Sequence, residues 1–149
     1  MNYFDTSALI KRFVEEPGSN AVSALIDAQP MVATSIVAYA EVHAGLARKL
    51  RERAMTTRVH RQTARAFDAD WRAFLRVTVT DPLLTLTRDL VRRHPLRGFD
   101  AIHLAAAVRL QSELAETVRF VAADARLLAA ADAEGLDMLD VRPEPHRRA

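Results

Sequence analysis

Cysteine is absent from the 149-residue sequence, and glycine occurs only four times. Without cysteine the chain has no disulfide scaffold, no cysteine nucleophile and no zinc site that depends on thiolates, and a reducing compartment suits it. The glycines lie too far apart to form a GxGxxG dinucleotide loop or the phosphate-binding loop of P-loop enzymes. The ordinary nucleotide-binding motifs are therefore excluded.

Long apolar runs are missing as well. No stretch approaches the roughly 18 apolar residues that cross a membrane, and the N-terminal residues MNYFD lack the basic stretch and apolar core of a secretion signal. We expect a cytoplasmic protein that contacts no membrane. The last residues, 143–149, carry no apolar period, and we expect them to form a mobile tail without a catalytic role.

Half of the residues are hydrophobic and 27% are charged, which is typical of a globular domain. Short apolar runs alternate with longer segments of helical periodicity, a pattern typical of a parallel sheet covered by helices. We predict a single α/β domain over 1–142 with a central, mostly parallel sheet of about five short strands. The predicted strands are 1–4, 31–33, 76–79, 119–122 and 136–141.

Serine and aspartate mark the expected helix starts. Ser7 is placed to cap a helix over 8–15, and Ser35 is placed to cap a long helix after the second strand. Asp81, which precedes a proline, is expected to cap a helix that reaches residue 94.

The formal net charge is only +2, but the cations are distributed unevenly. Segment 48–76 contains nine cations and three acids. The cations are Arg48, Lys49, Arg51, Arg53, Arg58, Arg61, Arg65, Arg72 and Arg76, and the acids are Glu52, Asp68 and Asp70. A local excess of positive charge attracts polyanions and is expected of a nucleic-acid-binding surface. For any single arginine, a solvated helix face is an equally good explanation.

Four carboxylates lie near the ends of predicted strands. Asp5 follows the first strand, and Asp124 follows the fourth. Glu41 lies about two turns into the helix after the second strand, and Asp100 lies in the first turn of the helix that leads into the fourth. Ligands of open parallel sheets bind beyond the carboxyl ends of the strands, so we expect these four acids to face one crevice.

Carboxylates that share a crevice repel one another, and a divalent cation between them keeps them ionised. Because thiolates are absent and the five histidines are scattered, the ligand set favours Mg²⁺ or Mn²⁺ over zinc. Such ions activate water and neutralise the charge that builds on a phosphate during displacement. The acids therefore predict phosphodiester hydrolysis.

Each carboxylate also has a structural explanation. Asp5 and Asp124 could each cap the helix that follows, and for Asp124 taken alone this is the better explanation. Asp100 could interact with the helix macrodipole, and Glu41 could be an ordinary exposed glutamate. The joint placement of all four favours the functional interpretation.

Two further polar residues lie close to these acids in sequence. His103 follows Asp100 by three residues on the same helical face, and we expect it to form a hydrogen bond that orients a neighbour rather than to act in the chemistry. Ser7 follows Asp5 by two residues and can face the crevice or cap the helix. No histidine and acid are arranged around Ser7 in a motif that would make it a nucleophile.

Four segments carry a wider resemblance: FDTSAL at 4–9, Thr34-Ser35 with Glu41 six residues later, LRGFDAIHLA at 96–105, and FVAADARL at 120–127. In order and spacing they resemble the PIN-domain family and, within it, the VapC-type toxins of bacterial toxin–antitoxin modules. One such segment would be weak evidence, but four in the right order in one small α/β chain form a specific signal.

The resemblance implies a PIN-like three-layer sandwich and a Mg²⁺- or Mn²⁺-dependent endoribonuclease that blocks translation as the toxin of a type II toxin–antitoxin pair. The usual substrate class is tRNA or rRNA. By position, Asp5 and Asp100 would be core metal ligands, Glu41 and Asp124 would complete the acidic site, and Ser7 would support it. The resemblance also implies a homodimer and a cognate VapB-type antitoxin that lays a peptide along the toxin's groove.

One position departs from the family pattern. The family commonly has threonine or serine two residues before the last acid, whereas this chain has Ala122. A hydroxyl that would hold the site or a water is therefore absent at that position.

Two other functions are weighed against the nuclease. A non-catalytic RNA-binding or scaffolding module would use only the basic face, and the intact set of four acids argues against it. A phosphatase with a phosphoaspartate intermediate would need an acid two residues after Asp5, where this chain has Ser7.

Overall fold

A computed structural model describes residues 1–29 and 31–143, and a five-stranded sheet lies at its centre. The strands are β1 (Asn2–Phe4), β2 (Val32–Ser35), β3 (Leu75–Val77), β4 (Arg119–Ala122) and β5 (Asp137–Asp140). Their order is β3-β2-β1-β4-β5, and every neighbouring pair is parallel. The predicted sheet of about five parallel strands is confirmed.

The order of the strands creates a switch point beside β1. The chain runs outward from β1 through β2 to β3, and then returns to the other side of β1 with β4 and β5. Connections on the two sides leave in opposite directions, so a crevice opens at the carboxyl ends of β1 and β4. Asp5 and Asp124 lie directly after these two strands.

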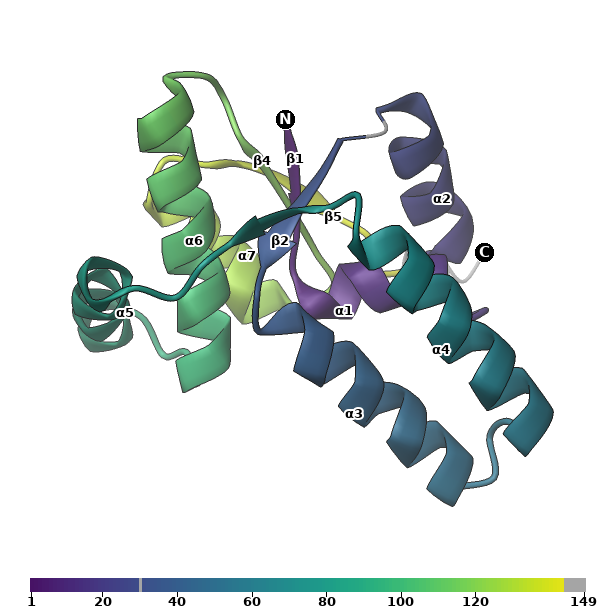
Figure 1. Ribbon diagram of the computed structural model, residues 1–149. Helices are drawn as coiled ribbons and strands as arrows, with labels where there is room; N and C mark the ends of the chain where they lie inside the picture. The colour runs from purple at the N-terminus through teal and green to yellow at the C-terminus, as the bar shows by residue number, and fades with distance from the viewer. Residues whose placement is uncertain (30, 144–149) are drawn as a thin grey trace, which may run out of the picture.

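Side chains alternate along the strands and build one core on each face of the sheet. Tyr3 and Phe120 belong to the core beneath α5, α6 and α7, whereas Phe4 and Val121 belong to the core beneath α1, α2, α3 and α4. The three layers are visible in Figure 1, where α5, α6 and α7 lie on one side of the sheet and α1 to α4 on the other. The predicted three-layer sandwich is confirmed.

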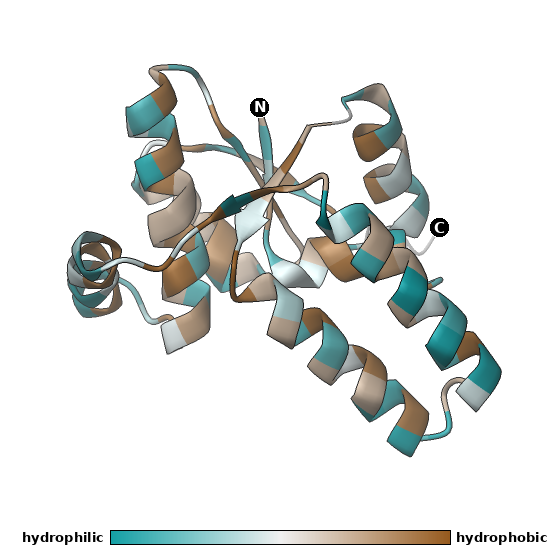
Figure 2. Ribbon diagram, viewed as in Figure 1, coloured by the Kyte–Doolittle hydropathy of each residue, from teal (hydrophilic) through white to brown (hydrophobic). Residues whose placement is uncertain are grey.

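The bounds of the helices follow from local signals. They are α1 (Thr6–Leu9), the short 3₁₀ helix η1 (Ile10–Arg12), α2 (Ser19–Ala28), α3 (Ala38–Arg51), α4 (Thr57–Trp71), α5 (Asp81–Arg93), α6 (Gly98–Leu114) and α7 (Ala125–Ala133). Helices α3 and α4 form a long hairpin whose far end is mostly hydrophilic (Figure 2). No helix among the described residues is long and apolar enough to cross a membrane.

Three of the predicted caps are wrong by a small shift in sequence. Asp5 caps α1, because its carboxylate accepts from the Ala8 amide, and Ser7 therefore lies inside the helix. Ser35 ends β2, and α3 begins without a side-chain cap. Thr80 caps α5, which places Asp81 in the first turn. At α1 and α5 a neighbouring polar residue, Asp5 or Thr80, takes the extended backbone that a cap requires.

The later start of α3 changes the position of Glu41. The helix begins at Ala38, so Glu41 lies in its first turn rather than about two turns along it. This shift brings Glu41 closer to the carboxyl end of β2, on the side of the predicted crevice. The predicted tail, 143–149, lies outside the described residues from position 144 onward.

A buried cation holds the turn before α2, and this turn packs against the end of the sheet. Lys11 is buried, and its Nζ donates to Glu16 Oε1 at 3.0 Å and to the Pro17 carbonyl at 2.8 Å. Gly18 follows with φ of 95°, a left-handed conformation that favours glycine. A Cβ at Gly18 would collide with the carbonyl oxygen of Val141, which follows β5.

This contact predicts unequal costs for alanine at two glycines. Gly135 also has positive φ, at 82°, but no atom lies within 4 Å of the site of its Cβ. Gly135→Ala should lower the free energy of unfolding by about 1 kcal/mol through backbone strain alone. Gly18→Ala adds the collision and should lower it by about 3 kcal/mol. Urea unfolding of both variants measures the difference, and equal losses would contradict the proposed packing against Val141.

Candidate active site

A cavity of about 1020 Å³ opens at the carboxyl ends of the strands, where the switch point predicts a crevice. Its lining includes three of the four predicted acids, Glu41, Asp100 and Asp124. The fourth acid, Asp5, is only 3% exposed and does not line the cavity.

Backbone and hydroxyl donors hold the Asp5 carboxylate. The Ala8 amide donates to Oδ1 at 3.1 Å, and the Ser7 hydroxyl lies 2.8 Å from Oδ1 and 2.9 Å from Oδ2. The Ser7 oxygen also accepts from the Ala123 amide at 2.9 Å. Ser7 therefore connects the acid after β1 to the backbone after β4, across the switch point.

Burial raises the pKa of Asp5 to about 6, from an ordinary value of 3.8. The charge of His103 and the hydrogen bonds from Ser7 and Ala8 act in the opposite direction and do not cancel the loss of water. The folded protein therefore holds a carboxylate that lacks full compensation for its negative charge.

Glu41 is compensated differently, by a buried histidine. His103 is 1% exposed, and its Nε2 lies 2.7 Å from Glu41 Oε1 while its Nδ1 lies 2.9 Å from the Tyr3 hydroxyl. The Thr6 hydroxyl donates to the same Glu41 oxygen at 2.8 Å and lies 3.1 Å from Nε2. These contacts hold the imidazole ring of His103 between Tyr3 and Glu41.

This network lowers the pKa of Glu41. Burial alone would raise it, but the hydrogen bonds from His103 and Thr6, together with the charge of His103, outweigh burial. Glu41 is thus held ionised and fixed in position. As expected from the sequence, His103 forms a hydrogen bond that orients a neighbouring residue, here Glu41.

Asp100 and Asp124 interact through their charges. Burial is the main cause that raises the pKa of Asp100, and the charges of Asp124 and Glu41 raise it further, while His103 and Arg97 lower it. Asp124 caps α7, because its Oδ1 accepts from the Leu127 amide at 3.0 Å. Asp124 therefore caps α7 and lines the cavity at the same time.

Three arginines that sequence reasoning did not single out also line the cavity: Arg97, Arg126 and Arg142. Arg142 pairs with Asp140, with 2.6 Å between Nη2 and Oδ2. Arg97 and Arg126 form no ion pair with another described residue. The cavity thus combines carboxylates with two arginines that are available to an anionic ligand.

Thr6 and Tyr3 were also missed, although both lie beside residues that the sequence did single out. Thr6 stands between Asp5 and Ser7 in the motif, and a hydroxyl there was available to bond a neighbouring acid. Tyr3 belongs to a predicted buried strand, and its hydroxyl bonds to His103 from 100 residues away in sequence. No local pattern identifies a partner at that distance.

The chemistry of the donors fits a divalent cation. Among residues 1–29 and 31–143, no three acidic or histidine side chains are already arranged around a point where a metal ion could bind. The four acids nevertheless supply only oxygen, the ligand that Mg²⁺ and Mn²⁺ prefer. Burial raises the pKa of both Asp5 and Asp100, like charges raise that of Asp100 further, and a nearby cation would offset these effects.

Comparison with known proteins identifies similar sequences. The family model of the PIN domain matches residues 3–133. Two ribonucleases of Mycobacterium tuberculosis, VapC45 of strain CDC 1551 / Oshkosh and VapC49 of strain ATCC 25618 / H37Rv, are each 38% identical over 106 residues. The matched region covers 71% of this chain and 74% of each relative.

Two solved structures share the fold. A toxin-antitoxin complex from Klebsiella pneumoniae superposes with a TM-score of 0.65 at 15% identity, over 96% of this chain and 99% of that chain. FitAcB from Neisseria gonorrhoeae superposes with a TM-score of 0.70 at 16% identity, over 95% of this chain and 98% of that chain.

The raised pKa of Asp5 predicts how stability depends on pH in EDTA. Ionisation is harder in the folded state, so the stability that protonated Asp5 contributes is complete below about pH 4 and is lost as the pH rises through 6. Asp5→Asn keeps an acceptor for the Ala8 amide and removes the charge. At pH 8 it should therefore be more stable than the wild type, by a difference on the order of 3 kcal/mol.

Denaturant unfolding at pH 4 and pH 8 measures this difference. The gain in Asp5→Asn should disappear at pH 4, where both side chains are neutral. Asp132→Asn, which removes an exposed acid of α7, serves as the control and should leave the pH dependence unchanged. A gain of the same size at both pH values would contradict the role assigned to Asp5 burial.

Proposed function

The chain belongs to the PIN-domain family, and on that premise we propose that it is a metal-dependent endoribonuclease that hydrolyses RNA phosphodiester bonds. The observation that carries the proposal is the set of acids at the switch point. Glu41, Asp100 and Asp124 line one cavity, and the buried Asp5 adjoins them through Ser7 and the end of β4.

Asp5 and Asp100 are the proposed core ligands of Mg²⁺ or Mn²⁺, with Glu41 and Asp124 completing the site. Such an ion, when bound, supplies activation of water and neutralisation of the negative charge on the phosphate. The raised pKa of Asp5 and Asp100 supports this assignment, because both carboxylates lack sufficient compensating charge.

The remaining side chains position the acids and the substrate. Ser7 orients Asp5, and His103 and Thr6 fix one oxygen of Glu41. Arg97 and Arg126 would hold the phosphates that flank the cleaved bond, as unpaired guanidinium groups on the cavity wall. The hydrogen bonds from His103 and Thr6 keep Glu41 ionised and fix the position of its side chain.

The proposed biological role is that of the toxin of a type II toxin–antitoxin pair that blocks translation by cutting tRNA or rRNA. The two similar proteins at 38% identity are named as VapC ribonucleases, and the folds that superpose include a toxin-antitoxin complex. A cognate VapB-type antitoxin and a homodimer complete this proposal.

A non-catalytic RNA-binding module is the second candidate. The exposed arginines of segment 48–76 favour it, because they suffice to attract RNA without any chemistry. It does not explain the buried carboxylate of Asp5, whose pKa is raised by burial.

Incubation of the purified, antitoxin-free protein with total cellular RNA tests the proposed activity. Discrete cuts are expected in Mg²⁺ or Mn²⁺ and not in EDTA, with fragment ends sequenced to locate them. Asp100→Asn should reduce cleavage by at least about a thousandfold, because the loss of a transition-state interaction of about 4 kcal/mol has this effect. Its far-UV circular dichroism should match that of the wild type.

Cleavage by Asp100→Asn at the wild-type rate would show that the site is assigned wrongly. RNA that the folded protein binds tightly but never cuts, in any metal, would favour the binding module.

The arginine assignment predicts a smaller effect. Arg126→Ala should lower kcat/KM for RNA about tenfold to a hundredfold, as expected for the loss of one charged hydrogen bond to a phosphate. Arg109→Ala is the matched control, since Arg109 lies on α6 and pairs with Glu113. Equal kcat/KM in the two variants would remove Arg126 from the substrate site.

A further inference from the structure

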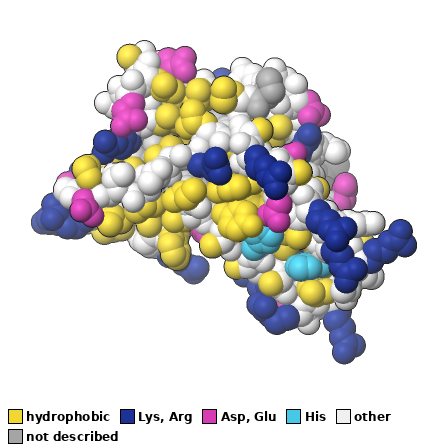
Figure 3. All heavy atoms as spheres, viewed as in Figure 1, with side chains coloured by type: hydrophobic (Ala, Val, Ile, Leu, Met, Phe, Trp, Pro, Cys, Tyr) yellow, Lys and Arg dark blue, Asp and Glu magenta, His cyan; other side chains and the backbone are white. Residues whose placement is uncertain are grey.

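A second, smaller hollow lies on the α3–α4 side of the molecule. It has a volume of about 430 Å³ and is lined by Ile36, Tyr39, Asp68, Trp71 and Arg72. The exposed side chains of Ile36 and Tyr39 belong to its apolar part. In Figure 3 a hydrophobic patch on the visible face lies beside Lys or Arg, Asp or Glu, and His side chains.

Tyr39 presents its ring to this hollow. The ring is packed against His43, with 4.7 Å between centroids, and against Trp71, with 5.3 Å between centroids. Its side chain is nevertheless 41% exposed. His43 is itself fixed, because its Nε2 lies 2.8 Å from Asp68 Oδ1. The hollow therefore has an aromatic wall that is held in place and open to solvent.

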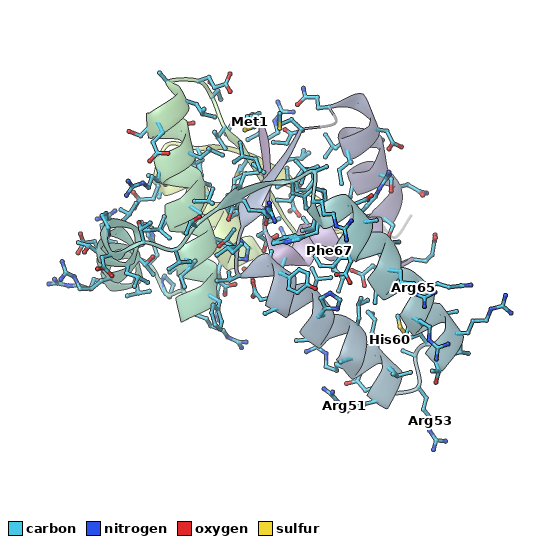
Figure 4. The ribbon with its side chains drawn as sticks, in the orientation of Figure 1. Met1, Arg51, Arg53, His60, Arg65 and Phe67 are labelled. Carbon is cyan, nitrogen blue, oxygen red and sulfur yellow. The ribbon has the colours of Figure 1, made fainter. Side chains whose placement is uncertain are left out.

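Cations surround this aromatic wall. The Arg76 guanidinium lies over the Trp71 ring, 5.7 Å from its centroid, and Arg72 lines the hollow itself. Neither arginine forms an ion pair with another described residue. Figure 4 shows Arg51 and Arg53 at the far end of the same hairpin and Arg65 part-way along α4, with Phe67 between the two helices.

The hollow and the acidic cavity flank the start of α3. Tyr39 and Glu41 both lie in the first two turns of this helix and are two residues apart, so their side chains leave it on different sides. Glu41 lines the cavity and Tyr39 lines the hollow. A chain that crosses the N-terminus of α3 would reach both.

We propose that this hollow is a stacking subsite for one base of single-stranded RNA, next to the nucleotide whose phosphate enters the acidic cavity. The inference rests on the proposed function and adds a base-binding site to it. An exposed aromatic ring accepts the face of any base, and neighbouring arginines attract the phosphates on either side.

The charge around the hollow favours a nucleic-acid ligand over a second copy of this chain. The unpaired arginines around the hollow would repel the same surface of a second copy and attract a polyanion.

The single tryptophan of the sequence, Trp71, provides a direct probe. The protein used is full-length Asp100→Asn in EDTA, so that RNA is bound and not cut. A short oligoribonucleotide that carries all its bases is titrated alongside a series of the same length, in which each oligomer has an abasic site at a different internal position. The base-bearing oligomer should quench Trp71 fluorescence, and one abasic position should abolish the quenching.

Variants of Tyr39 measure the contribution of stacking. In the same background, Tyr39→Ala should weaken binding of the base-bearing oligomer about tenfold to a hundredfold, while Tyr39→Phe keeps the ring and should bind within about twofold. Arg72→Ala should weaken binding of all the oligomers alike, because its contribution is mainly to phosphates. Arg88→Ala, which removes an exposed cation from α5, is the matched control.

Three results would overturn the subsite. One is binding of RNA without any change in Trp71 fluorescence, and another is equal affinity for base-bearing and abasic oligomers. The third is a fluorescence change that depends on protein concentration and not on RNA, which would assign the hollow to contact between copies. Each of these leaves RNA cleavage by the wild type untouched, so the subsite and the proposed nuclease fail separately.

Discussion

The carboxylate of Asp5 lies almost out of contact with water, at the point where the sheet changes direction. Placing a charge there is unfavourable, and burial raises the pKa of Asp5 to about 6 for this reason. Much of the local structure limits this cost: Asp5 caps α1, the Ser7 hydroxyl donates to the Asp5 carboxylate, and the Ser7 oxygen accepts from the backbone after β4. The carboxylate and the junction of the two strands therefore depend on each other.

The four acids differ in how their charge is balanced. Glu41 has a histidine and a threonine as donors, and its pKa is lowered. Asp100 is partly buried and has Asp124 and Glu41 as charged neighbours, and both effects raise its pKa. The protein thus fixes one carboxylate by its own hydrogen bonds and leaves others short of positive charge. An added cation would interact most strongly with this second group. The proposal of a metal-dependent nuclease depends on this inequality, together with the family to which the chain belongs.

Periodicity and strand-end logic predicted the sheet, its parallel pairing and the gathering of Glu41, Asp100 and Asp124 around one cavity. These features follow from apolar alternation and from the geometry of parallel sheets, which are local or general properties. The caps were harder to predict, since Asp5 and Ser7 are equally good capping residues and only the exact start of α1 distinguishes them. The contact between Tyr3 and His103 was beyond reach, because it joins the first strand to α6. The Ser7 link to Ala123 was equally hidden, and it places a hydroxyl at the end of β4, close to where Ala122 lacks one.

Binding of Mn²⁺, followed by electron paramagnetic resonance, tests the central claim most directly, because it requires neither an RNA substrate nor turnover. The wild type should bind Mn²⁺, and Asp5→Asn and Asp100→Asn should each weaken this binding at least about tenfold, the effect of about 1.4 kcal/mol. Asp132→Asn, on the exposed face of α7, should bind as the wild type does. Equal affinity in all four proteins, or no binding by the folded wild type at millimolar Mn²⁺, would contradict the account.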